Sequence, residues 1–373
     1  MRKEENRKKV KKLFILGAGA SFSLTKQNLS NIHKQAPLDC EFCERIIKLK
    51  GKVKWISDAQ KRIKKDWKDH NSFIKLGLEE AIIKQIGHFD FLKSIHSRRS
   101  HSRTINEYFY DIIHLIVATL DKAEEKNTDI VKRFIRHIFS GKDYTKQKNR
   151  VITFNYDTLI DQHLYNKFKL TEIYFDRILT ESSLGQNKRS GGKIKYPLLI
   201  KLHGSINWHV NKQDYDNILS NEKIEGVKRN TSTFDTGDCY FIEKIVKKDS
   251  IPSPSDESTP LILPPMPQKP ITNIAIFRYL WTYAYEYLHE CEELIICGYS
   301  FPETDTLAES MFSNFSNKHI KKITIIDPNP TVIKKWKDLF SRSNLASKVV
   351  WEYYDDFVEY IEIKCKKKSK KTK

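Results

Sequence analysis

The sequence predicts an α/β fold in which a doubly wound parallel sheet is interrupted by a large all-helical insertion. Three near-continuous apolar runs, Leu198–Ile200, Leu294–Ile296 and Ile323–Ile326, suit strands that are buried on both faces of a parallel sheet. Helical patterns separate several of the strand candidates, as they do in βαβ units. Between the first two strand candidates, residues 55–140 show a helical pattern almost throughout. Together these features predict a Rossmann-like architecture.

The composition bounds the class of protein but does not identify its activity. The chain has 373 residues, enough for one large α/β domain or two smaller ones, and 39% of them are hydrophobic. Its formal net charge of +19 suits either a nucleic-acid partner or a lysine-rich surface, with part of the excess in the two ends of the chain. A basic face binds polyanions without specificity, and it also attracts an anionic dinucleotide. We therefore expect nucleic acid to bind only indirectly or non-specifically.

Apolar runs and cysteines indicate the compartment. No apolar run reaches the roughly 20 residues that a membrane-spanning helix needs, and no hydrophobic segment follows the charged start. The six cysteines do not form a disulfide framework in a chain of this length. We expect a cytoplasmic, reduced protein without membrane contact.

The stretch KLFILGAGASFS, residues 12–23, predicts the first strand and the turn after it. Its apolar run leads into glycines, alanines and a serine, the pattern of a buried parallel strand that feeds a helix N-terminus. Backbone N–H groups and the helix dipole make such a corner an anion site. The usual dinucleotide fingerprint has a third glycine three residues after the second, and Phe22 stands there instead.

Helices and further strands follow in chain order. The segment DCEFCERIIKLK starts a helical stretch, and residues 70–86 and 105–125 repeat apolar side chains at steps of three and four. Strand signals resume at five places, which are residues 150–158, 195–210, 294–300, 322–330 and 347–356.

Small or polar residues follow each apolar run of the predicted sheet. They are Gly17–Ser21, Thr153–Asp157, His203–Ser205, Gly298–Ser300 with Thr304 and Asp305, and Asp327–Asn329. Turns alone favour such residues. Ligands of open α/β sheets, however, bind beyond the carboxyl ends of the strands. All five groups together predict a nucleotide cleft at that edge.

In this order the motifs GAGAS, TFNYDT, KLHGSI, GYS and DPN resemble the sirtuin family, of the silent-information-regulator type. The chain looks most like the divergent sirtuin-like NAD-consuming domains of bacterial anti-phage defence proteins. The resemblance implies a Rossmann-type NAD-binding domain over residues 12–43 and 148–363. The helical pattern predicts an insertion over 44–147, and the last residues, 364–373, are expected to form a disordered basic tail. In that family the GAGxS corner packs against the NAD pyrophosphate, and its turn is not of the three-glycine type.

The resemblance also implies roles for single residues. Asn155 matches the asparagine that contacts the nicotinamide ribose and positions water, and His203 matches the histidine that acts as base on the ribose hydroxyls. Asp157 matches the aspartate two residues after that asparagine, but it suits a helix cap equally well, as does Asp305. The implied cofactor-binding residues are Gly17, Ala18, Gly19, Ala20, Ser21, Gly298, Ser300, Asp327 and Asn329.

The residue types themselves suit cleavage of the nicotinamide–ribose bond. Cleavage expels a neutral pyridine from a cation and passes through an oxocarbenium-like sugar. The carboxamide of Asn155 offers both a donor and an acceptor to hold the ribose and orient water. The imidazole of His203 is the side chain whose ordinary pKa suits a base near neutral pH.

The chain departs from deacetylating sirtuins at their zinc module, which has two CxxC pairs. Only Cys40 and Cys43 form such a pair, so we expect no metal. They suit the inner face of a helix instead. Asp39 in APLDCEF suits either the family's Pro-Asp-Phe loop over the nicotinamide or an N-cap. Without the zinc module, water is favoured over an acetyl group as the acceptor.

These observations predict an NAD+ glycohydrolase that releases nicotinamide and ADP-ribose, as an effector of abortive anti-phage defence by NAD depletion. Such an activity has to be held in check, so we expect a homo-oligomer or a partner, by family analogy a HerA-type ATPase or an Argonaute-type protein. The alternatives are a non-catalytic sensor of NAD or ADP-ribose and a protein ADP-ribosyltransferase or deacylase of sirtuin type. A basic nucleic-acid-binding protein is a further alternative.

Overall fold

The computed structural model describes most of the chain. The described residues are 10–26, 34–49, 54–67, 70–95, 104–123, 128–141, 143, 146–174, 197–211, 215, 240–241, 258–266, 275–302, 304–345 and 348–365. The last eight residues of the predicted basic tail lie outside them.

A six-stranded parallel sheet forms the centre of the molecule, in the order β11-β9-β7-β1-β2-β3. Its strands are β1 (Lys12–Leu16), β2 (Arg150–Thr153), β3 (Leu199–Lys201), β7 (Glu293–Cys297), β9 (Lys322–Ile326) and β11 (Val350–Tyr354). With only the six strands of this sheet numbered, in chain order, this is the doubly wound order 3-2-1-4-5-6. The strand order reverses between β1 and β7, because the chain adds strands first on one side of β1 and then on the other. The fold class predicted from the sequence is confirmed.

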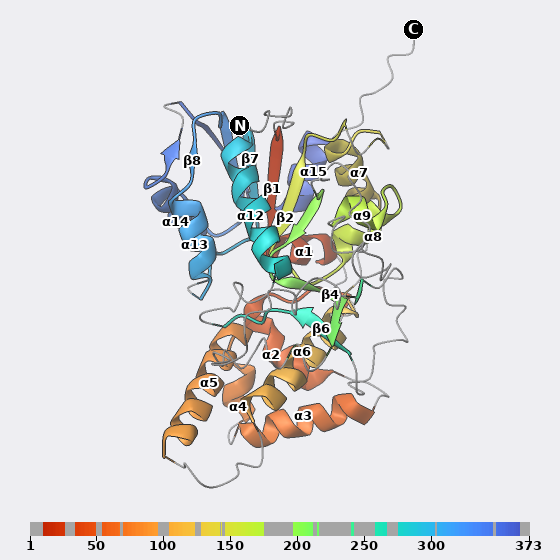
Figure 1. The fold of residues 1–373 in the computed structure, drawn as a ribbon, viewed down its shortest axis with the longest axis vertical. Helices are drawn as coiled ribbons and strands as arrows, with labels where there is room; N and C mark the ends of the chain where they lie inside the picture. The colour runs from red at the N-terminus through yellow and green to blue at the C-terminus, as the bar shows by residue number, and fades with distance from the viewer. Residues whose placement is uncertain are drawn as a thin grey trace, which may run out of the picture.

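The apolar runs form strands because helices cover both faces of the sheet. In Figure 1, α12 (Ala275–Glu290) lies in front of the sheet and α15 (Phe357–Lys364) lies behind it. The remaining helices of this part are α1 (Ala18–Thr25), α7 (Thr128–Ile138), α8 (Leu159–Tyr165), α9 (Leu170–Ile173), α13 (Thr306–Ser313) and α14 (Pro330–Phe340). Among the described helices, none is long and apolar enough to cross a membrane.

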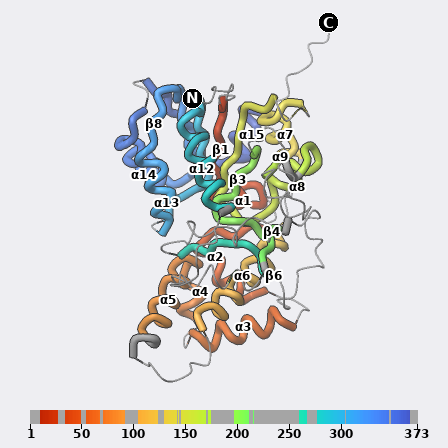
Figure 2. The backbone as a smooth tube through the Cα atoms, in the orientation of Figure 1, coloured from red at the N-terminus to blue at the C-terminus, as the bar shows by residue number. Residues whose placement is uncertain are grey.

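Five helices gather at one end of the molecule, beyond the carboxyl ends of the strands (Figures 1 and 2). They are α2 (Asp39–Lys48), α3 (Lys54–Asp66), α4 (His70–Ile74), α5 (Leu78–Ile95) and α6 (Ile105–Leu120), and we call them the helical block. Thr104 and Glu107 form a capping box at the start of α6. In contrast, α7 contacts α8 and α15 beside the sheet. The predicted domain boundaries stay a prediction.

The predicted strand segment 195–210 is divided between two sheets. It enters the central sheet as β3 and continues as β4 (Gly204–Asn211), which pairs in antiparallel fashion with β5 (Tyr240–Phe241) and β6 (Ser258–Ile262). Gly204 has φ +83°, and a Cβ there would lie 2.0 Å from the carbonyl oxygen of Leu261. Only glycine makes this corner without strain, so the corner places His203 just beyond the sheet edge. A further pair of short strands, β8 (Ser316–Asn317) and β10 (Asn344–Leu345), is separate.

Candidate active site at the carboxyl edge of the sheet

The loops after β1 and β7 touch each other where the strand order reverses. The amide of Gly17 donates to the carbonyl of Cys297, and the amide of Gly19 donates to the carbonyl of Gly298, both at 2.9 Å. Gly298 has φ +57°, and a Cβ there would lie 2.4 Å from the Cα of Gly19. These glycines therefore permit backbone-to-backbone contact between the two loops. Ala18 and Ser300, two more predicted binding residues, are exposed beside this contact.

Ser21, Asn155 and Asp157 form one hydrogen-bonded group across the ends of β1 and β2. The Asn155 side-chain amide donates to the carbonyl of Gly17 at 2.8 Å and to Ser21 Oγ at 2.9 Å. Ser21 Oγ in turn donates to Asp157 Oδ2 at 2.6 Å. Asn155 is half-buried, and none of the residues that the structure describes donates to its Oδ1. The carboxamide is thus fixed by its nitrogen, and its oxygen is available as an acceptor.

Asp157 is buried and is bonded from several sides. Its Oδ1 accepts a hydrogen bond from the amide of Leu159, the first residue of α8, at 3.1 Å, although the N-cap of this helix is Thr158. Burial raises the pKa of the Asp157 carboxyl, and the nearby Lys201 and the hydrogen bond from Ser21 oppose that rise. Asp157 therefore bonds the first residue of α8 without being the N-cap of that helix, and it is tied to Ser21 at the same time.

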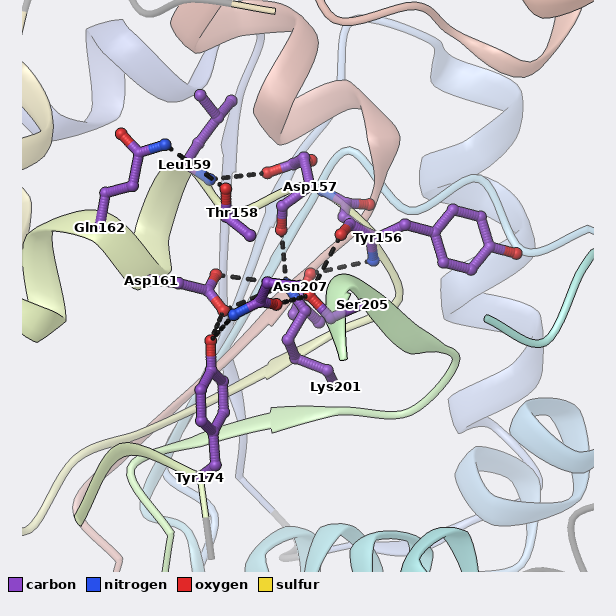
Figure 3. Close-up of polar contacts among 12 residues, drawn as sticks. Tyr156, Asp157, Thr158, Leu159, Asp161, Gln162, Tyr174, Lys201, Ser205 and Asn207 are labelled. Carbon is purple, nitrogen blue, oxygen red and sulfur yellow. Dashed lines mark hydrogen bonds and ion pairs between the residues drawn. The ribbon is translucent and has the colours of Figure 1, made fainter. Parts of the chain in front are cut away.

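A buried network supports this group from below (Figure 3). Lys201 on β3 is fully buried, donates to the carbonyl oxygen of Asp157 and pairs with Asp161 Oδ2 at 3.2 Å. Tyr174 donates to Asp161 and accepts from Asn207 Nδ2 at 3.1 Å. We call Lys201, Asp161, Tyr174 and Asn207 the Lys201 network. It fixes the backbone that carries Asn155 and Asp157.

The Lys201 network was missed in the sequence. Its one visible signal is a lysine inside an otherwise apolar strand, in LIKLHG. A lysine is almost never fully buried unless it is paired, but the sequence alone does not name the partner. Asp161 lies within a helical pattern, and Tyr174 and Asn207 belong to other elements.

His203 lies at the corner between β3 and β4 and is surrounded by aromatic rings. Its ring centroid is 5.1 Å from that of Phe154 and 6.4 Å from those of Tyr156 and Trp281. On its remaining side, Nε2 lies 3.3 Å from Asp305 Oδ2, and both side chains are buried. The aromatic rings exclude water, which strengthens the interaction between the imidazole and the carboxylate.

Asp327 and Asn329 follow β9 and hold their own turn. The amide of Asn329 donates to Asp327 Oδ1 at 2.9 Å, and Asn329 Oδ1 accepts from the amide of Thr331 as the N-cap of α14. Burial raises the pKa of Asp327. Ala20 is buried in the first turn of α1. The binding roles predicted for Asp327, Asn329 and Ala20 stay predictions, because the hydrogen bonds that Asp327 and Asn329 make join groups of the protein itself.

The predicted CxxC pair divides between two environments. Cys43 is buried in the core, whereas Cys40, in the first turn of α2, is exposed. Asp39 is the first residue of α2 rather than its N-cap, which is Leu38. Its Oδ1 accepts from the amide of Glu79 in α5 at 3.1 Å. Among the described residues, no cluster of histidine, cysteine and carboxylate side chains could hold a metal ion.

The strand order, the reversal between β1 and β7 and the polar groups gathered there define a Rossmann-like α/β protein with its candidate site at the switch point. A family model described as SIR2-like domain matches residues 149–349, more than half of the chain. The chain belongs to this SIR2-like, divergent sirtuin family, as its motifs indicated. SIR2-like domains are typically NAD-dependent enzymes, so the family implies NAD+ use.

Two further comparisons add little. No curated protein matches the chain. Among solved structures, a chain described under "The Structural basis of Sirtuin Substrate Affinity" is 14% identical, with 95% of this chain and 92% of that chain covered and a TM-score of 0.37. The fold assignment rests on the sheet order instead.

Proposed function

We propose that this protein is an NAD+ glycohydrolase, with Asn155 and His203 as its catalytic residues. The observation that carries the proposal is the state of Asn155. Its amide nitrogen is fixed by Gly17 and Ser21 at the strand edge, while its Oδ1 accepts no hydrogen bond from the described residues. A fixed, half-buried acceptor at the strand edge, next in the chain to Phe154, whose ring contacts that of His203, suits the orientation of a water molecule against a sugar carbon.

The reaction balances with these two groups. The bond between nicotinamide nitrogen and ribose C1′ breaks, and its electron pair returns to the nicotinamide ring, which leaves neutral. Water, held by Asn155 Oδ1, forms a new bond to C1′ and gives ADP-ribose. His203, the base at the ribose hydroxyls, takes up the proton that the reaction releases.

In this proposal the pyrophosphate of NAD+ binds at the loops after β1 and β7, apart from the catalytic residues. The loops after β1 and β7 meet beside the start of α1, where a helix dipole favours phosphate. Exposed Ala18 and Ser300 are the predicted binding residues that lie at the surface there. The role as an anti-phage effector, and control by a partner or by self-association, extend the proposal on the family resemblance alone.

Release of nicotinamide from NAD+, measured by chromatography, tests the proposal. Asn155→Ala and His203→Ala should each lower the rate by about 10²–10⁴-fold, because each removes a group that acts in the transition state. Asn314→Ala and His319→Ala are matched controls, since both positions are exposed at the opposite edge of the sheet.

Calorimetry with NAD+ separates the alternatives. Binding without release by any variant favours the sensor. Release by wild type that both active-site substitutions leave intact contradicts the proposed roles. If NAD+ neither binds nor reacts, the proposal is wrong.

A further inference from the structure

We propose that Asp305 is a positioning residue for His203, and that the helical block holds Asp305 in place. This inference rests on the proposed function, in which His203 is the base. It adds a carboxylate from the segment after β7 to a site whose predicted catalytic residues follow β2 and β3. It also gives the helical block a part in the chemistry.

The first observation is that Asp305 stands at the N-cap of α13 but makes no cap hydrogen bond with its side chain. The N-cap is where an aspartate ordinarily bonds its own helix. Here the carboxylate turns away from the helix, toward His203 Nε2 at 3.3 Å and the hydroxyl of Tyr299, which donates to the same Oδ2. Asp305 is 1% exposed. A buried carboxylate that forgoes its own cap and faces an imidazole acts on that imidazole.

The second observation is that the segment before Asp305 is fixed by its neighbours. Phe301 has φ +63°, a left-handed conformation that is strained for a non-glycine residue and persists only where its surroundings impose it. Lys335 donates to the Phe301 carbonyl, and Trp336 Nε1 donates to the carbonyl of Tyr299 at 3.1 Å. The chain is thus held in an unfavourable conformation just before the carboxylate.

The third observation connects this segment to the helical block. Glu79, in the first turn of α5, accepts a hydrogen bond from the amide of Thr304 at 3.0 Å. The amide of Glu79 itself donates to Asp39 on α2. Two helices of the block therefore fix the residue next to Asp305. A displacement of α5 would move the carboxylate away from His203, which couples the helical block to the base.

The carboxylate has two effects on His203 in this arrangement. It favours a proton on Nε2, which fixes the ring's orientation, and it stabilises the imidazolium that forms when the base takes up a proton. In the described part of the chain, the titratable groups that face the pair are Tyr156 and Tyr299 from the strand ends and Glu79 from the helical block, with Asp39 close to Tyr156.

The test compares Asp305→Asn with wild type in the pH dependence of nicotinamide release and in an NMR titration of the His203 ring. The His203 signal among the twelve histidines is the one absent from His203→Ala. Without the carboxylate, the imidazole loses its proton at lower pH. The acid limb of the rate profile and the titration midpoint should both move to lower pH by about one unit. We expect kcat to fall by about 10- to 100-fold, less than on loss of the base itself, with KM little changed.

Tyr299→Phe gives a second, opposite expectation. It removes one donor from the carboxylate and leaves the ring contact with Phe154 and the His203 contact in place. The carboxylate then acts more strongly on the imidazole, so the midpoint should move to higher pH. This variant decides the question if Asp305→Asn does not fold.

Unchanged midpoints in both variants would overturn the role of Asp305. The titration needs no turnover, so it distinguishes the two proposals. A wild-type protein that binds NAD+ without releasing nicotinamide refutes the glycohydrolase, while a shifted midpoint still supports the contact between Asp305 and His203.

Discussion

Loss of the buried lysine should destabilise the fold by an amount that the structure allows us to work out. Lys201 is fully buried and pairs with Asp161 at 3.2 Å. Lys201→Met keeps the volume of the side chain but leaves Asp161 as a buried carboxylate without its cation. Removing one partner of a buried pair costs about 3–5 kcal/mol. The carbonyl of Asp157 loses its donor as well, so we expect the upper half of this range.

Urea unfolding followed by circular dichroism measures the change in free energy of unfolding. A double-mutant cycle with Asp161→Leu separates the pair from the rest of the network. Lys321→Met is the matched control, because Lys321 pairs with Glu292 at 3.0 Å but is largely exposed. It should cost less than about 1 kcal/mol. If Lys201→Met costs no more than this control, the pair does not contribute as a buried ion pair and the reasoning is wrong.

Two further predictions concern backbone geometry and pH. Gly298→Ala should lower the free energy of unfolding by more than about 1–3 kcal/mol and abolish nicotinamide release, because its Cβ would lie 2.4 Å from the backbone of Gly19. The control is Gly87→Ala, whose Cβ would have nothing within 4 Å. It should instead stabilise α5 by up to about 1 kcal/mol. Burial lowers the pKa of His209 to about 4, so the unfolded chain binds its proton first, and stability should fall by up to about 3 kcal/mol as pH drops from 6.5 to 4. His209→Phe should flatten that part of the stability–pH curve, and an unchanged curve would assign the loss to other groups.

The central sheet could be predicted because its strands carry their own signal. Apart from the edge strand β11, whose residues are not buried, each is a mainly apolar run followed by turn residues, and burial between two helix layers favours that pattern. The division of 195–210 could not be predicted in the same way, because β3 and β4 form one apolar stretch and only the positive φ of Gly204 separates them. The place of α7 beside the sheet was also not evident, since its apolar stripe fits either neighbour.

The site was predictable to the extent that it lies at strand ends. Asn155 and His203 come two residues after their strands, and Ser21 lies in the helix that begins two residues after β1, so the topology alone places them at one edge. For Asp305 the sequence predicts only a helix cap or a ligand contact. Its contact with His203 depends on the left-handed backbone conformation of Phe301, which no sequence pattern predicts. Lys201 and Asp161 are 40 residues apart in the sequence.

The stability of the fold alone does not explain why a buried ion pair, with its desolvation penalty, stands at the centre of the Lys201 network. Well-packed apolar side chains of similar volume are often as stabilising as a buried ion pair, or more so. Lys201→Met combined with Asp161→Leu should therefore recover part of the stability that Lys201→Met loses. No apolar side chain, however, donates to the carbonyl of Asp157, which follows Asn155 by two residues. The double variant should thus be more stable than Lys201→Met, though less stable than wild type by the roughly 1–3 kcal/mol of this unpaired carbonyl. It should still release nicotinamide about 10-fold more slowly, because Asn155 loses its fixed position. Recovery of both properties together would mean that the network serves only to stabilise the fold.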